Sequence, residues 1–187
     1  SSELVIDTTA SDTPTVTALT SNDTTPAITG TATVGSGETL SVTVNGVTYT
    51  AGDGNLVLTG SNWTLTVPAG NALTEGSYQV VATVRDAAGN TTSDSTTSEL
   101  VIDTTAPTAP TINALTSNDT TPAITGTATV VSGETLSVTV NGVTYTVGDG
   151  NLSLDGTNWT LNTPSALGDG TYQVVATVRD AAGNTTS

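Results

Sequence analysis

The chain of 187 residues contains no cysteine, methionine, phenylalanine or histidine, and its only basic side chains are Arg85 and Arg179. Without cysteine it can form neither a disulfide framework nor a thiolate metal site. Without histidine it lacks the usual transition-metal ligand and the usual general base, which excludes a Ser/His/Asp or Cys/His catalytic set. A glycosidase with paired carboxylates is formally open, but it would need a substrate cleft. We therefore expect a protein that is not an enzyme.

Most of the charged residues in the chain are acidic. Seventeen acidic residues give a formal net charge of −15 at pH 7. A surface of this charge repels nucleic-acid backbones and anionic lipid, so we expect no nucleic-acid partner. No apolar run is long enough to span a bilayer, and we expect no membrane insertion. Cations are the natural partners, and the available carboxylates, amides and carbonyls are ligands typical of calcium.

The sequence consists of two near-copies joined by residues 99–107. The stretch Glu3-Leu-Val-Ile-Asp-Thr-Thr recurs from Glu99, and after a two-residue deletion the match continues to Ser93 in one copy and Ser187 in the other. Copies this similar are typical of a tandem array, in which each added copy adds length. We assign residues 1–8 to an upstream strand or linker, 9–103 to the first repeat and 104–187 to the second, in which we expect the last strand to be missing.

Short alternating stretches bounded by Gly, Asn, Asp and Pro predict an all-β fold. Asn45-Gly46 is a strong signal for a two-residue hairpin, and Gly52-Asp-Gly-Asn55 is interpreted as a bulge within one bent strand. Seven strands of this spacing predict two tandem immunoglobulin-like β-sandwich domains. The strands expected in the first copy lie at residues 15–19, 26–33, 40–44, 47–58, 63–67, 78–84 and 91–102.

Four motifs occur in this order: Asn-Asp-Thr-Thr-Pro, Asn-Trp-Thr-Leu, Asp-Ala-Ala-Gly-Asn and Ile-Asp-Thr-Thr-Ala-Pro. With them the chain resembles, over essentially its whole length, the bacterial immunoglobulin-like repeats of giant surface adhesins. That family includes biofilm-associated and RTX-type adhesins exported by type I secretion. The resemblance implies extracellular, non-catalytic extender repeats that project a ligand-binding tip from the cell surface, with calcium near the domain junctions stiffening the array.

Strand directions in a seven-strand sandwich predict where the acidic turns meet. The turn after the first strand and the end of the last strand lie at one pole, and the turn before the last strand lies at the other. Carboxylates about 4 Å apart repel by roughly 4 kcal/mol at an effective dielectric near 20, so a cation would hold such a group together. The predicted calcium ligands are Asn22, Asp23, Asp103, Asp180 and Asn184 at the central junction, Asp7, Asp86 and Asn90 at the upstream end, and Asp119 at the downstream end.

Simpler interpretations stand beside this one. Asp and Asn are also the residues that tight turns require. Trp63 and Trp159 are expected in the core, and the alternative is a carbohydrate-binding module that uses them, or a calcium in a loop, to bind sugar. An exposed tryptophan face would favour that module. A further alternative is an accessory spacer of a secreted enzyme.

The motif at residues 3–7 permits two predictions. If Leu100–Ile102 form the last strand of the first domain, then residues 4–6 of one molecule can complete the open edge of the second domain of another, which gives head-to-tail strand exchange. In the competing prediction, residues 3–7 are the first half of the first strand within their own domain. Backbone hydrogen bonds from Val5 decide between the two.

Overall fold

The computed structural model describes residues 4–187, and within them it is all-β with a single 3₁₀ turn, η1 (Ala69–Asn71). The chain divides between Thr104 and Thr105 into two units. Each unit is an immunoglobulin-like sandwich, which confirms the predicted fold class. No helix in residues 4–187 is long and apolar enough to cross a membrane.

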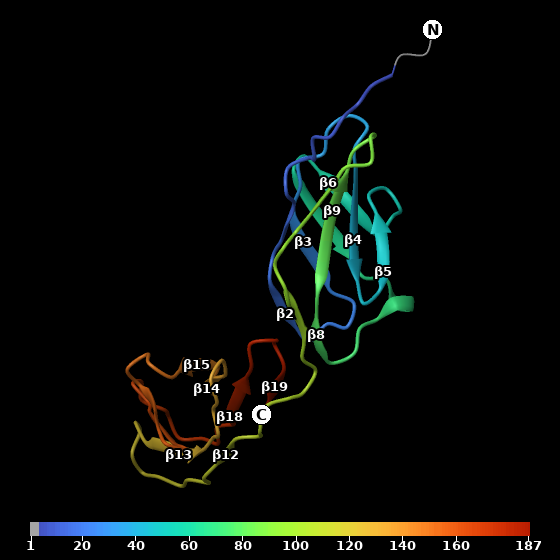
Figure 1. Cartoon of the computed structure of the whole chain (residues 1–187). Coiled ribbons are helices and arrows are strands. Elements are labelled where there is room, and N and C mark those ends of the chain that lie inside the picture. The colour runs from blue at the N-terminus through green and yellow to red at the C-terminus, as the bar shows by residue number, and fades with distance from the viewer. Residues whose placement is uncertain (1–3) are drawn as a thin grey trace. The chain divides into compact units, whose positions relative to one another are not determined.

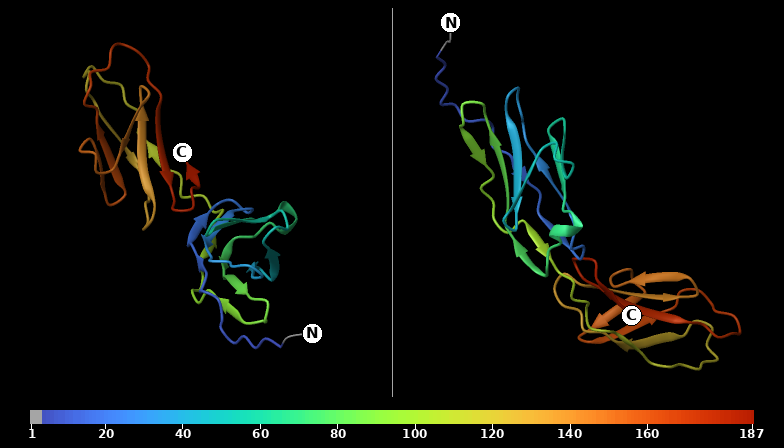
Figure 2. Two further views of the ribbon diagram at one scale, coloured as in Figure 1. Left: turned by 90° about the horizontal axis from the view of Figure 1, so that it is seen from above. Right: turned by 90° about the vertical axis from the view of Figure 1, so that its right-hand side faces the viewer.

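Unit 1 contains two four-stranded antiparallel sheets (Figure 1). The left view of Figure 2 looks approximately along the strands of this unit. The first sheet has the order β1 (Thr15–Val16), β3 (Ala27–Thr31), β7 (Asn62–Thr66), β6 (Leu56–Thr59). The second has the order β10 (Thr91–Ser93), β9 (Val80–Arg85), β4 (Thr39–Val44), β5 (Val47–Thr50).

A third, three-stranded sheet closes one end of unit 1. Its order is β2 (Leu19–Ser21), β11 (Leu100–Ile102), β8 (Gly76–Tyr78). The central strand β11 runs parallel to β2 and antiparallel to β8. Leu100 and Ile102 are fully buried in the core of the unit. Residues 100–102 therefore close unit 1, as the sequence predicted. The single last strand predicted at residues 91–102 is wrong, however, because β10 pairs with β9 in the second sheet whereas β11 pairs with β2 and β8 in the third.

Unit 2 repeats the two larger sheets. One has the order β12 (Thr111–Ile112), β13 (Ala123–Thr127), β17 (Asn158–Asn162), β16 (Leu152–Asp155). The other has the order β15 (Val143–Thr146), β14 (Thr135–Val140), β18 (Val174–Arg179), β19 (Thr185–Thr186). The described residues of unit 2 form no counterpart of the three-stranded sheet.

A tryptophan packed on a glycine centres each core. Trp63 in β7 faces Gly30 in β3, and its Nε1 donates to the Thr15 carbonyl at 3.2 Å. A Cβ on Gly30 would lie 2.4 Å from the Trp63 ring and 2.0 Å from the Thr15 oxygen, so only glycine fits. Trp159, Gly126 and Thr111 repeat the arrangement in unit 2.

The Asn45-Gly46 hairpin is confirmed, because β4 and β5 pair across it and both residues have positive φ, 49° and 76°. The predicted bulge at Gly52–Asn55 is wrong. β5 pairs with β4 and β6 pairs with β7, so this stretch carries the chain from one sheet to the other. Asp53 holds the crossing by accepting hydrogen bonds from the backbone amides of Thr50, Asn55 and Leu56 at 2.8–3.0 Å.

The single first strand predicted at residues 15–19 is also wrong. β1 pairs with β3, whereas β2 pairs with β11, so the strand breaks at Thr17-Ala18 and changes sheets.

The competing prediction for the N-terminal motif fails as well, since residues 4–7 form no strand and are exposed. Figure 1 shows this segment leaving the end of unit 1. Glu3 lies outside the described residues. Whether residues 4–6 pair with another molecule stays a prediction.

Candidate metal sites at the ends of the repeats

The turn between β9 and β10 holds the incoming chain at one end of unit 1. The Asn90 side-chain amide donates to Asp86 Oδ2 at 2.8 Å, to the Asp7 carbonyl at 3.1 Å and to the Thr9 carbonyl at 3.4 Å. Asp86 Oδ1 caps the turn by accepting from the backbone amides of Gly89 and Asn90. Three predicted ligands, Asp7, Asp86 and Asn90, are thus brought together in a hydrogen-bonded clasp.

Glu38 and Thr92, which the sequence patterns did not single out, extend this clasp through Ser11. Glu38 accepts from the Ser11 hydroxyl and from the Gly35 amide, each at 2.6 Å. Thr92 donates to the Ser11 carbonyl at 2.8 Å. Glu38 recurs as Glu134 in the second copy, but its link to Ser11 spans 27 positions, and no local motif predicts a contact of that range.

The carboxylates of the clasp are stabilised in their ionised form. The hydrogen bond from the Asn90 side chain lowers the pKa of Asp86, and backbone amides of the turn lower it further against a smaller effect of burial. The hydrogen bonds from Ser11 and Gly35 lower the pKa of Glu38, although the nearby charge of Asp86 raises it. The carboxylates of Asp86 and Glu38 are therefore both favoured in their negatively charged form, and both lie at the same end of unit 1.

The opposite end of unit 1 contains the first turn and the end of β11. The Asp103 amide donates to the Ser21 carbonyl at 3.0 Å, so the turn with Asn22 and Asp23 lies beside Asp103, as predicted. Asp23 Oδ1 accepts from the amide and hydroxyl of Thr25 at 2.8 and 2.9 Å. The Thr104 hydroxyl donates to Glu75 at 3.1 Å, which adds a carboxylate that the sequence prediction missed.

The predicted ligands of unit 2 have the same local geometry. Asp180 accepts from the Gly183 and Asn184 amides at 2.7 and 2.8 Å and from the Asn184 side chain at 2.8 Å. Burial raises the pKa of Asp180, but these hydrogen bonds outweigh it and the pKa is lowered. Asp119 caps the Thr121 amide at 2.9 Å. The Asp180 and Asp119 side chains therefore also stabilise their own turns by hydrogen bonding.

The possible metal ligands at the ends of the units are oxygen atoms. In residues 4–187, no three His, Cys, Asp or Glu side chains lie close enough together to hold a metal ion by themselves. Asp86, Asn90 and the Asp7 and Thr9 carbonyls would supply carboxylate, amide and backbone oxygens, the set that calcium accepts. The donors fit calcium in kind, and calcium binding stays a prediction.

Glu99, just before β11, is a buried carboxylate. Its Oε2 accepts from the Val80 amide at 3.1 Å, and its carbonyl accepts from the Leu19 amide at 2.7 Å. Burial raises the pKa of Glu99, but hydrogen bonds from Thr96 and from backbone amides hold it below its ordinary value. Glu99 thus fastens the start of the closing strand to β2 and to the first residue of β9.

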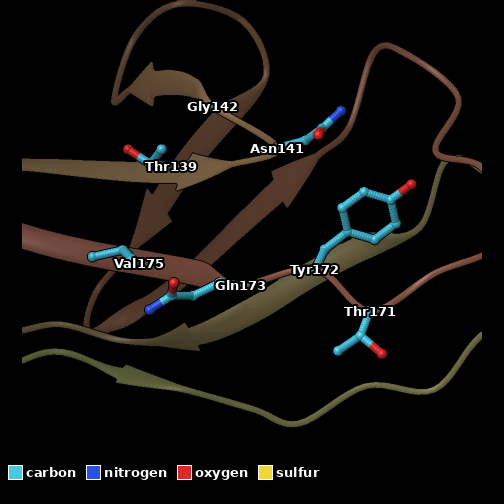
Figure 3. Close-up of a pocket in the computed structure, with 7 residues that line it drawn as sticks. All are labelled: Thr139, Asn141, Gly142, Thr171, Tyr172, Gln173 and Val175. Carbon is cyan, nitrogen blue, oxygen red and sulfur yellow. The ribbon is translucent and has the colours of Figure 1, made fainter.

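Unit 2 has a shallow pocket of about 340 Å³ beside the β14–β15 hairpin (Figure 3). Its lining is formed by Thr139, Asn141, Gly142, Thr171, Tyr172, Gln173 and Val175. Tyr172 and Thr171 point to opposite sides of the chain, and none of the seven side chains is an acid or a base at neutral pH. The pocket offers no converging set of catalytic groups.

Both tryptophans are fully buried. A sugar platform needs an aromatic face open to solvent, so the prediction of a carbohydrate-binding module that uses Trp63 or Trp159 is wrong.

Two solved structures of adhesion proteins are similar to this chain. The first is from a 1.5-MDa bacterial ice-binding adhesin that is retained at the host cell surface, at 32% identity over 93% of this chain and 60% of that one, with a TM-score of 0.44. The second is a tetra-tandem repeat from the extending region of a large adhesion protein, at 27% identity over 93% and 46%, with a TM-score of 0.35. The chain thus spans less than two thirds of either structure. A comparison with curated proteins found no match.

The model of the bacterial Ig-like domain matches residues 2–104 and again residues 111–187. Domains of this kind are structural and generally non-catalytic. The chain belongs to the bacterial Ig-like domain family.

Proposed function

We propose that the two units are non-catalytic extender repeats of a bacterial surface adhesin, located outside the cell and placing a distal ligand-binding tip away from it. The observation that carries the proposal is the position of β11. This strand is hydrogen-bonded on both sides within unit 1, and only residues 103–110 separate it from the first strand of unit 2. A connection of eight residues limits how far successive domains can separate along the chain, as a spacer of defined length requires.

The similarity to an adhesin and to the extending region of a large adhesion protein supports the same function. Type I secretion and membership of the RTX or biofilm-associated adhesins are further parts of the proposal.

We further propose that calcium binds at the ends of the repeats and stiffens the array. The net charge of −15 favours cation binding. Asp7, Asp86 and Asn90 at one end and Asn22, Asp23 and Asp103 at the other supply oxygen donors close to where the chain enters and leaves unit 1. Asp180, Asn184 and Asp119 are the matching donors of unit 2.

Small-angle scattering with 2 mM calcium and with excess chelator would test the proposal. Calcium should lengthen the maximum dimension and raise the melting temperature, since an ion that binds only the folded state stabilises it. Asp103→Ala should abolish the lengthening and reduce the rise in melting temperature, since the donors at the other end of unit 1 remain, whereas Asp155→Ala, an exposed control in β16, should retain both effects. Scattering curves that coincide in calcium and chelator would overturn the calcium proposal but leave the spacer function standing. A wide distribution of interunit distances under both conditions would overturn the spacer function itself.

A further inference from the structure

Glu99 is a buried carboxylate of unit 1 whose negative charge is not balanced by a nearby basic side chain. The residue is 5% exposed, and within the described residues its Oε1 atom is buried and accepts no hydrogen bond. The only basic side chain of unit 1 is Arg85, which is five residues along β9 from Val80 and so about 16 Å from the amide that Glu99 binds. A buried carboxylate without a counter-charge is unfavourable, which indicates that a ligand is bound there.

A second carboxylate is connected to Glu99 through a single hydroxyl group. The Thr96 hydroxyl donates to Asp94 Oδ2 at 2.6 Å, and the Thr96 amide donates to the same oxygen at 3.2 Å. This hydroxyl also acts on Glu99, since it is among the groups that lower the pKa of Glu99 against the effect of burial. A hydroxyl has one proton and donates to one acceptor at a time. Two carboxylates therefore converge on one oxygen atom with only one proton to share.

The cluster of Asp94, Thr96 and Glu99 is separate from the candidate sites at the ends of unit 1. The Asp94 amide donates to the carbonyl of Ala82, which precedes Asp86 by four residues, and Glu99 precedes Asp103 by four residues. At about 3.3 Å per residue, each of these separations is about 13 Å. Asp94 is partly buried and Thr96 is exposed, so an ion can reach the cluster from solvent.

We propose that Asp94, Thr96 and Glu99 bind one divalent cation, for which calcium is the best fit. The two carboxylates carry two negative charges, and one divalent ion balances both. All the ligands are oxygen atoms, and they come from the irregular loop between β10 and β11, a geometry that calcium tolerates better than magnesium. The ion would fasten this loop to the start of the closing strand β11. The site goes beyond the proposed function, because it acts within one unit and not at the ends of the repeats.

Amide NMR of the full chain during a calcium titration tests the position of the site. The Val80 and Thr96 amide resonances should shift and reach saturation below about 10 mM calcium. The shifts should persist in Asp103→Ala and Asp86→Asn, which alter the proposed end sites, and disappear in Glu99→Gln. The proposal is overturned if these resonances stay fixed, if they shift equally in Glu99→Gln, or if the shifts vanish in Asp103→Ala. Shifts that persist while scattering shows no effect of calcium would support this site and overturn only the calcium sites at the ends.

The free energy of unfolding of unit 1 distinguishes a bound ion from a carboxylate that is merely structural. In chelator, Glu99→Gln should be at least as stable as the wild type, because the amide oxygen can still accept from Val80 and the buried charge is gone. Calcium at about ten times its dissociation constant should lower the unfolding equilibrium constant about elevenfold through this site, and Glu99→Gln should lack that part of the response.

Thr96→Val should weaken calcium binding at the cluster, because it removes the shared hydroxyl, whereas Thr97→Val, at the exposed neighbouring position, should retain the wild-type affinity. The Val80 amide shift reports the affinity in both variants. Equal affinities for Thr96→Val and Thr97→Val, or an equal gain in stability from calcium in Glu99→Gln and the wild type, would overturn the proposal.

Discussion

Two leucines in identical sequence motifs, Leu100 and Leu4, should differ strongly in how much stability is lost when each is replaced by alanine. Leu100 is fully buried between β2 and β8, whereas Leu4 is 84% exposed. Leu100→Ala removes core contacts at a site with backbone on both sides, which limits collapse of the cavity, and we expect a loss of about 3 kcal/mol in the free energy of unfolding of unit 1. Leu4→Ala should cost less than about 0.5 kcal/mol, because this side chain is exposed.

Urea unfolding followed by fluorine NMR of fluorotryptophan can separate the two units, because each contains one tryptophan, Trp63 or Trp159. Leu100→Ala should lower the midpoint of the Trp63 resonance by about 2 M urea and leave that of Trp159 nearly unchanged. Equal shifts for Leu100→Ala and Leu4→Ala, or a shift confined to Trp159, would refute the assignment of β11 as the closing strand of unit 1.

Gly30→Ala should destabilise unit 1 by about 3 kcal/mol, since the added methyl meets the tryptophan ring and a carbonyl, while Gly70→Ala, with no atom within 4 Å, should stay within about 0.5 kcal/mol in the same urea experiment. Asn90→Ala should speed amide exchange at residues 7–9 without speeding it in β4 or β9, because the amide that binds the Asp7 and Thr9 carbonyls is lost; exchange that rises everywhere equally would contradict a local clasp. The lowered pKa values of Asp86 and Asp180 predict stability that is complete above the unfolded value near 3.8 and lost as the pH falls through the folded values. Acid titrations of the melting temperature should therefore be flatter for Asp86→Asn, and an unchanged acid slope would count against this cause.

The sequence was sufficient for those features that depend on local chemistry. Alternation placed Trp63 and Leu65 in the core, and Asn45-Gly46 forms the expected hairpin because both residues tolerate positive φ. The acidic turns meet the chain where strand direction predicts, with Asp103 beside the first turn and Asn90 beside Asp7.

The errors arose where a strand changes sheets. Gly52–Asn55 looks like a bulge because the apolar pattern continues on both sides, but pattern alone does not reveal whether two segments share a partner. The break in the first strand has the same origin, since alternation does not distinguish pairing with β3 from pairing with β11. Glu38 and Glu75 were missed because their partners are distant in sequence.

The pairing of β11 also bears on the proposed role as a spacer under load. The chain enters unit 1 at the end where Asn90 binds residues 7–9 and leaves it at the other end through Asp103. Because β2 and β11 are parallel, a pull on the two ends draws the start of β2 and the end of β11 in opposite directions along the strand axis. The backbone hydrogen bonds between β2 and β11 are then perpendicular to the pulling force and are loaded at the same time. They include those from the Leu19 amide to the Glu99 carbonyl at 2.7 Å and from the Asp103 amide to the Ser21 carbonyl at 3.0 Å. These hydrogen bonds would break one at a time only if both strands were pulled from the same end. A parallel closing strand that is also the exit from the domain therefore suits a repeat whose function is to keep its length under tension.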